Sequence, residues 1–227
     1  NLPPKRSIAL LSKNCAHWII ADWAIWMAGH VTVPLYPTLN ADTVAYILEH
    51  SEAKLLFVGK LDDWDEMKGG IPENMSGISF ELSPEEVKHK YPQWDSVIKN
   101  VAPMTENTVR EPKETATIVY TSGSTGRPKG VMLSFYSMAF AAGGAVDSLK
   151  INDQDRMLSY LPLAHVMERF VVEMASISVG FKLYVSSIFA KTGLAPRATI
   201  ASTGATKVHA VVMTSSPGPI PKAARAE

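Results

Sequence analysis

The segment that decides the fold of this 227-residue chain is Thr117-Ile-Val-Tyr-Thr-Ser-Gly-Ser-Thr-Gly-Arg-Pro-Lys-Gly-Val131. It begins as an apolar strand that ends near Tyr120, and it continues as a loop from Thr121 to Gly126 that is rich in hydroxyl groups and glycine. The glycines in this loop allow the backbone to turn sharply and to present its N–H groups to an anion. Lys129 adds a full positive charge. The segment therefore predicts a loop that binds a polyphosphate.

The candidate ligands of this phosphate-binding loop are hydroxyl groups, backbone amides and one ammonium group: Thr121, Ser122, Gly123, Ser124, Thr125, Gly126 and Lys129. Two common nucleotide motifs do not fit the loop. A Walker loop counted from Gly123 would need glycine where Pro128 stands, and a dinucleotide fingerprint would need glycine where Thr125 stands. A Ser/Gly-rich surface turn is the alternative that such a composition usually indicates.

Alternating strand and helix patterns along the chain predict the fold class. Strands are expected at residues 8–11, 31–33, 55–58, 117–120, 157–161 and 181–185. Helices are expected at residues 14–28, 41–50, 134–149 and 166–179, with Gly29 and Gly180 just past two of their ends. This order predicts an α/β fold with parallel-sheet-rich layers wrapped by helices.

Two local patterns bear on the organisation of the chain. Ser83-Pro-Glu-Glu86 has the Ser-x-x-Glu pattern of a capping box with proline at the first helical position, and it predicts a short helix. Residues 95–115 are polar and contain two prolines, so they are the best candidate linker. We expect residues 1–110 and 111–185 to be two α/β parts of one domain, and residues 186–227 to be an aberrant or disordered tail, because no periodicity survives there.

The stretch from Tyr120 to Gly130 resembles, almost residue for residue, the phosphate-binding loop of the adenylate-forming superfamily. This superfamily includes acyl-CoA synthetases, firefly luciferase and the adenylation domains of peptide synthetases. Leu161-Pro-Leu-Ala-His-Val-Met-Glu-Arg-Phe170 resembles the next motif of the family, whose histidine lines the carboxylate and acyl pocket. The matching residue is His165, which alone would more often be a packing or capping histidine. Glu168 and Arg169 are expected to be solvated or paired helix charges.

Further stretches resemble the long-chain fatty-acyl-CoA synthetase branch of this superfamily. They include Ile8 to Asn14, Val33-Pro-Leu-Tyr-Pro-Thr38 and Leu158 to Pro162, and the resemblance covers about residues 5–185. It implies the fold of the large N-terminal domain of these enzymes. The family's later motifs are not recognisable after residue 185, and the chain begins with Asn1 rather than methionine. We therefore expect an N-terminal fragment of a longer enzyme.

Composition limits the other classes of function. The chain has 22 basic and 22 acidic residues and no net charge, so it lacks the basic field that nucleic-acid binding favours. Its single cysteine, Cys15, is expected to be a buried inert thiol, and the histidines show no metal-ligand spacing. The apolar run at 8–11 is too short for a signal-peptide core, and His17 and Asp22 interrupt the longest apolar segment, so no membrane span is expected. We expect a cytoplasmic protein, with peripheral membrane contact and a homodimer left open.

The resemblance implies a two-step reaction on fatty acid, ATP and coenzyme A. The fatty carboxylate attacks the α-phosphorus of ATP to give acyl-AMP and pyrophosphate, and the CoA thiol then displaces AMP. By the same resemblance Lys129 and His165 are catalytic, the loop amides hold phosphates, and Thr121 contacts Mg²⁺. Another adenylating enzyme, an acyl-acyl-carrier-protein ligase or a luciferase-like oxygenase, is one alternative. A non-catalytic nucleotide-binding fragment is the other.

Overall fold

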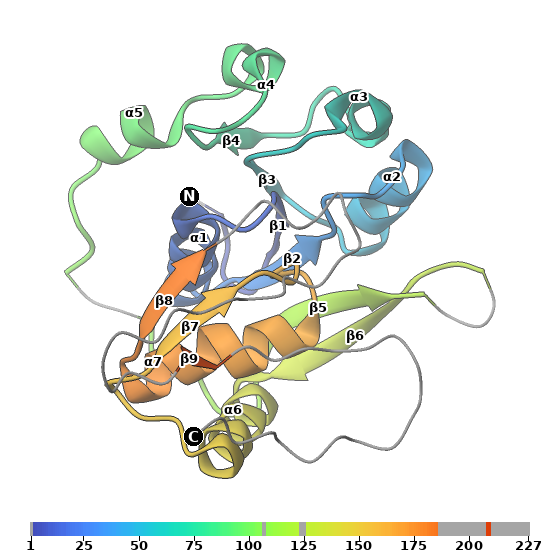
Figure 1. Ribbon diagram of the computed structural model, residues 1–227. Helices are drawn as coiled ribbons and strands as arrows, with labels where there is room; N and C mark the ends of the chain where they lie inside the picture. Colours follow the sequence, from blue (N-terminus) through green and yellow to red (C-terminus); the bar gives the residue numbers. More distant parts are fainter. Residues whose placement is uncertain (1, 106–107, 123–125, 186–207, 210–227) are drawn as a thin grey trace.

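Two β-sheets form the framework of the protein in a computed structural model that describes residues 2–105, 108–122, 126–185 and the backbone of 208–209 (Figure 1). The larger sheet has the strand order β4-β3-β1-β2-β5-β6, and the smaller sheet has the order β8-β7-β9. The strands of the larger sheet are β1 (Ser7–Leu11), β2 (Val31–Leu35), β3 (Leu55–Val58), β4 (Gly77–Ser79), β5 (Thr115–Thr121) and β6 (Lys129–Ser134). Those of the smaller sheet are β7 (Arg156–Ser159), β8 (Lys182–Val185) and β9 (Val208–His209).

The strands of both sheets run parallel except at one edge. Strands β1 to β5 pair with their neighbours in parallel, and β7 pairs in parallel with β8 and β9. Strand β6 runs antiparallel to β5, because a short loop between two paired strands can only return the chain in the opposite direction. The predicted α/β fold with a mostly parallel sheet is confirmed, and the phosphate-loop segment forms its antiparallel edge hairpin.

Helices of very different length cover these sheets. The helical segments are α1 (Ala16–Met27), α2 (Ala41–His50), α3 (Trp64–Met67), the 3₁₀ turn η1 (Lys68–Gly70), α4 (Glu85–Lys90), α5 (Trp94–Lys99), α6 (Phe135–Leu149), the π-helix η2 (Glu168–Met174) and α7 (Ala175–Val179). Gly29 and Gly180 follow α1 and α7 with φ of 82° and 85°. Glycine at both positions fits this left-handed backbone, which ends a helix without a Cβ clash.

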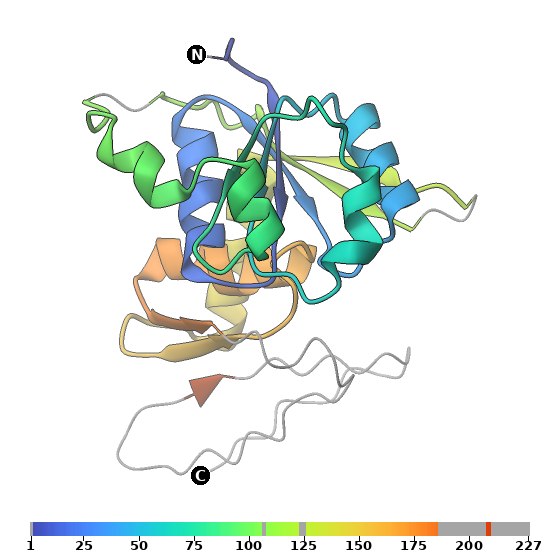
Figure 2. The same cartoon turned by 90° about the horizontal axis from the view of Figure 1, so that it is seen from above.

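The larger sheet buries side chains on both faces. Alternate residues of β1 point to opposite sides, so Ala9 packs toward α2, α3 and α4, while Leu10 packs toward α1 and α6. Figure 2 shows α1 on one side of the sheet and α2 and α3 on the other. Trp18 of α1 and Met138 of α6 are fully buried in the second of these cores. A third core, around Met157, lies between the smaller sheet and the η2–α7 segment.

The short helix predicted at Ser83 is confirmed as α4, but the capping box predicted to start it is wrong. Helix α4 begins at Glu85, and the Ser83 side chain forms no cap hydrogen bond. The buried Ser83 hydroxyl instead donates to the Val58 carbonyl at the end of β3, at 2.7 Å. The Ser83 hydroxyl therefore donates to a carbonyl distant in sequence, whereas in a capping box it would accept a local backbone N–H.

The predicted linker also carries more structure than its composition indicates. Helix α5 occupies its start, because Trp94 packs its ring against Phe57 and Phe80. Arg110 then anchors the chain by donating to the carbonyls of Trp26 and His30 at 3.1 and 2.9 Å.

Candidate active site

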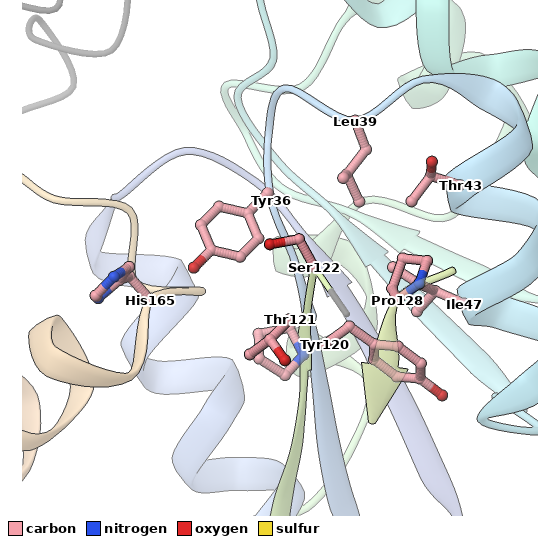
Figure 3. A pocket seen from close by; sticks show the side chains of 10 residues that line it. Tyr36, Leu39, Thr43, Ile47, Tyr120, Thr121, Ser122, Pro128 and His165 are labelled. Carbon is pink, nitrogen blue, oxygen red and sulfur yellow. The ribbon is translucent and has the colours of Figure 1, made fainter. Parts of the chain in front are cut away.

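A cleft of about 410 Å³ lies at the carboxyl ends of β2 and β5 (Figure 3). The sequence-predicted residues Thr121, Ser122 and His165 all line it. Its other lining residues are Pro34, Tyr36, Leu39, Thr43, Ile47, Tyr120 and Pro128. Ligands of parallel α/β folds collect outside the carboxyl ends of strands, and this volume suits a small-molecule site. The cleft is therefore the candidate active site.

The predicted phosphate-binding loop is the turn of the β5–β6 hairpin. Thr121 ends β5 and is the direct cross-strand partner of Lys129, which begins β6. Because facing residues of an antiparallel pair lie about 4.5–5.5 Å apart at Cα, the hydroxyl and the ammonium group start from the same level of the hairpin. Both residues are exposed, as a loop that receives a charged ligand requires.

The rest of the loop is partly described. Gly126 has φ of 88°, so its place in the left-handed region explains why glycine stands there. It lines a second cleft of about 450 Å³ beside α2, together with Arg127, whose guanidinium carbon lies 5.6 Å from the centre of the Tyr46 ring. Lys129 lines neither of these two clefts. The predicted ligands Gly123, Ser124 and Thr125 lie outside the described residues.

His165 lies where the chain passes from the smaller sheet into the η2 helix. Its backbone N–H donates to the Pro162 carbonyl at 2.8 Å, and its Nδ1 accepts the Met167 backbone N–H at 3.2 Å. Because Nδ1 is an acceptor, the proton of the neutral ring lies on Nε2, which can donate to an oxygen of a ligand. In Figure 3 His165 lies on the side of the cleft opposite Thr43 and Ile47, and the Tyr36 hydroxyl points toward it.

Asn14 holds the segment that leads to His165, although no site role was predicted for it from the sequence. The buried Asn14 side chain donates to the Ser159 hydroxyl at 2.9 Å and to the Leu161 carbonyl at 2.6 Å. Its carbonyl oxygen accepts the Leu163 N–H at 2.8 Å. A single side chain that follows β1 thus holds Ser159, Leu161 and Leu163, at the end of β7 and in the loop after it. Its only sequence signal was a polar residue three positions after a buried strand.

Glu168 and Arg169 were expected to be solvated or paired, and both are instead buried, at 3% and 1% exposed. Glu168 accepts the Tyr160 backbone N–H at 3.0 Å. Burial raises the pKa of the Glu168 carboxyl to about 7, against hydrogen bonds that favour its charged form. Arg169 forms ion pairs with the buried carboxylates of Asp22 and Glu173, so the expected pairing is confirmed for this residue.

The wall of the cleft opposite His165 is mostly apolar and is held by aromatic contacts. The Tyr120 hydroxyl lies 2.7 Å from His50 Nδ1, and the Tyr46 and Tyr120 rings meet edge to face. Burial raises the pKa of both Tyr36 and Tyr120, so both phenols stay neutral near pH 7. The hydroxyl of Tyr36 is therefore a neutral donor beside the cleft.

The single cysteine carries no sign of reactivity. Cys15 is half-buried ahead of α1, and burial raises the pKa of its thiol. A raised pKa keeps sulfur as the weakly nucleophilic thiol.

Neither a protein-built metal cluster nor a membrane-spanning segment is found among the described residues. No group of three or more His, Cys, Asp or Glu side chains there is arranged to hold a metal ion. Thr121 offers one hydroxyl. This fits Mg²⁺ if the ion takes its remaining ligands from water and from substrate oxygens. None of the helices in the described part of the chain combines the length and the apolar character needed to cross a membrane.

Comparison with known proteins places the sequence in one family. The family model described as "AMP-binding enzyme" matches residues 1–215. Long chain acyl-CoA synthetase 5 of Arabidopsis thaliana is 34% identical over 194 residues, which cover 74% of this chain and 27% of that protein. Fatty acyl-CoA synthetase B of Dictyostelium discoideum is 30% identical over 183 residues, covering 75% of this chain and 27% of that protein. The chain thus spans about a quarter of the length of these curated relatives.

Solved structures share the fold. The O-succinylbenzoate coenzyme A synthetase of Bacillus subtilis in complex with AMP superposes with a TM-score of 0.63 at 25% identity, covering 83% of this chain and 45% of that one. A putative long-chain-fatty-acid CoA ligase from Rhodopseudomonas palustris superposes with a TM-score of 0.67 at 21% identity, covering 82% and 46%. At the latter identity only the fold is comparable.

Proposed function

This chain belongs to the AMP-binding enzyme family, and we propose that the protein of which it forms part activates a long-chain fatty acid with ATP and transfers it to coenzyme A. The observation that carries the proposal is the shared cleft of Thr121, Ser122 and His165. It brings the end of the phosphate-binding strand and an imidazole donor to one space. That is the arrangement that joining a carboxylate to a nucleotide phosphate requires.

The residues of the β5–β6 hairpin take the nucleotide end of the site. Lys129 and the amides of the loop from Ser122 to Gly126 hold the β- and γ-phosphates, where the leaving pyrophosphate gathers negative charge. The hydroxyl of Thr121 would contact the magnesium ion that accompanies ATP. Coenzyme A enters as the second substrate.

His165 takes the acyl end of the site. Its Nε2–H donates to a carboxylate oxygen of the fatty acid, because Nδ1 is already occupied by the Met167 N–H. Leu39, Ile47 and Tyr120 give the cleft an apolar wall next to this donor, which suits an aliphatic substrate. The resemblance of curated relatives to this chain supports the long-chain class.

The domain organisation remains part of the proposal. Residues 1–110 and 111–185 form two parts of one domain, supported by the pairing of β5 with β2 through Thr32 and Thr117. The aberrant or disordered tail proposed for residues 186–227 lies outside the described residues, except for the backbone of 208–209.

The test is substrate-dependent exchange of pyrophosphate into ATP by the full-length protein. Acids from acetate to palmitate are compared at equal concentration, and product is followed as acyl-AMP and as acyl-CoA. The proposal expects exchange to depend on the acid, to favour long chains, and to yield a CoA thioester. Exchange without thioester formation, but with transfer to an acyl carrier protein, would favour the other adenylating enzymes. No acid-dependent exchange at all would overturn the proposal.

A further inference from the structure

A buried polar cluster connects the two sides of the candidate active site. Its members are Thr117 of β5, Asp22 of α1, and Arg169 and Glu173 of the π-helix η2, and each is at most 1% exposed. None of them reaches the cleft itself. The cluster is therefore separate from the residues proposed to touch substrate.

Arg169 is the centre of the cluster. Its guanidinium donates to the Thr117 hydroxyl at 2.6 Å, to the Asp22 carboxylate, and to the Glu173 carboxylate at 3.4 Å. The centres of the Trp18 and Trp26 rings lie 5.4 and 5.3 Å from the central carbon of the guanidinium. These rings further restrict the orientation of the guanidinium group. All three of its donor nitrogens are thus directed by different elements.

The cluster is balanced in charge when Glu173 is protonated. Burial raises the pKa of Glu173 well above its ordinary value, and the neighbouring Asp22 carboxylate raises it further. A proton on Glu173 can then bridge to Asp22. This leaves one guanidinium facing one carboxylate in the core.

Stability alone is a weak reason for such a cluster. Burying an ion pair costs about as much in lost hydration as its attraction returns, and apolar side chains of the same volume often stabilise a core equally well. A guanidinium fork, however, accepts only one relative arrangement of its partners. The cluster is thus better suited to fixing geometry than to adding stability.

The cluster joins the two segments that carry the cleft residues Thr121 and His165. Thr117 is on the strand that ends at Thr121, and its hydroxyl also donates to the Thr32 carbonyl of β2 at 2.9 Å. Arg169 is one turn after His165, and its backbone N–H donates to the His165 carbonyl at 3.2 Å. The π-helical winding of this segment is itself a feature that often accompanies functional sites.

From this arrangement we infer that Arg169 is a positioning residue, which sets the distance between the phosphate-loop strand and His165 through the Thr117 hydroxyl. The catalytic purpose of this role rests on the proposed function. The coupling of β5 to the His165 segment through Arg169 and Thr117 does not depend on it. Displacement of reacting groups by about 1 Å can lower a rate roughly 100-fold, so a fixed distance between these two elements has a direct kinetic effect.

The sharpest test is a matched pair of variants at Thr117. Thr117→Val keeps the shape of the side chain and removes the hydroxyl, whereas Thr117→Ser keeps the hydroxyl and removes a methyl group. Hydrogen exchange is measured by mass spectrometry on this chain, in peptides covering residues 115–122, 163–170 and, as a control, 41–50. We expect Thr117→Val to speed exchange in the first two peptides together by about tenfold or more, which corresponds to about 1.4 kcal/mol of local opening. Thr117→Ser should match the wild type in all three.

Loss of protection in 115–122 alone, or equal effects of valine and serine, would overturn the inference. Arg169→Met probes the same coupling from the other side, and should loosen 115–122. If this variant does not fold, the Thr117 pair still decides.

The kinetic arm uses the full-length protein and pyrophosphate exchange. Thr117→Val should lower kcat about tenfold or more while the KM for ATP changes by less than about threefold, and Thr117→Ser should restore kcat. An unchanged kcat in a folded Thr117→Val variant would overturn the positioning role. If the wild type shows no exchange, the proposed function fails, while the hydrogen-exchange result still decides whether the two elements are coupled.

Discussion

Substitution of Glu168 by glutamine should change how the stability of this protein depends on pH. The Glu168 carboxyl is 3% exposed and accepts the Tyr160 N–H at 3.0 Å. Burial raises its pKa from an ordinary 4.5 to about 7. Glutamine keeps the acceptor oxygen and cannot ionise, so it imitates the protonated carboxyl at every pH.

The sign follows from proton binding. The folded protein holds the Glu168 proton more tightly than the unfolded chain does, so this contribution to stability is fully present below pH 4.5 and is lost as pH rises through 7. One pH unit of difference in pKa is worth about 1.4 kcal/mol, so the full loss amounts to about 3 kcal/mol. Glu168→Gln should therefore differ from the wild type by less than about 1 kcal/mol at pH 5 and be more stable than it by about 3 kcal/mol at pH 8.

Urea unfolding of this chain at pH 5, 6, 7 and 8 measures the effect. Glu173 titrates in the same direction in both proteins, because burial raises its pKa as well, so the difference between wild type and variant isolates Glu168. Glu111→Gln, at an exposed glutamate, is the matched control and should leave the profile unchanged. Parallel profiles for Glu168→Gln and wild type would show that the carboxyl is ionised in the fold at neutral pH and would refute the reasoning.

Three further predictions concern the proposed chemistry. In the full-length protein Lys129→Ala should lower the adenylation rate by about 10- to 150-fold, because a charge-assisted phosphate contact contributes about 1.5–3 kcal/mol, while Lys99→Ala on exposed α5 should not; unchanged pyrophosphate release in folded Lys129→Ala would contradict the role. His165→Ala should impair acyl-AMP formation and leave ATP binding nearly intact by calorimetry, and an equal loss of ATP affinity would remove His165 from the acyl end of the site. The 227-residue chain alone should make no acyl-CoA from ATP, Mg²⁺, palmitate and CoA, since positioning groups act only together; turnover like that of the full-length protein would overturn this view.

Local patterns in the sequence were enough to locate the elements of the fold. The expected strand at 55–58 and helix at 41–50 coincide with β3 and α2, because periodicity of apolar residues reports which face of an element is buried. Glycine just past a helix was an equally local signal, and Gly29 and Gly180 both have the left-handed backbone it implies. The motif around Thr121 and the family relationship were likewise readable from neighbouring residues.

Tertiary structure decided which polar residues serve the candidate site. Ser83 bonds to a strand instead of capping a helix, and Asn14 holds a loop that begins almost 150 residues later. Arg169 resembles an ordinary helix charge until α1 and β5 supply its partners, and Glu168 does so until the Tyr160 backbone meets it. A side chain's burial and partners depend on segments that are distant in sequence, and a hydrogen bond across 145 residues leaves no periodic trace. Local sequence motifs therefore indicate where a ligand binds. Only the packed fold determines which buried groups fix the geometry of the site.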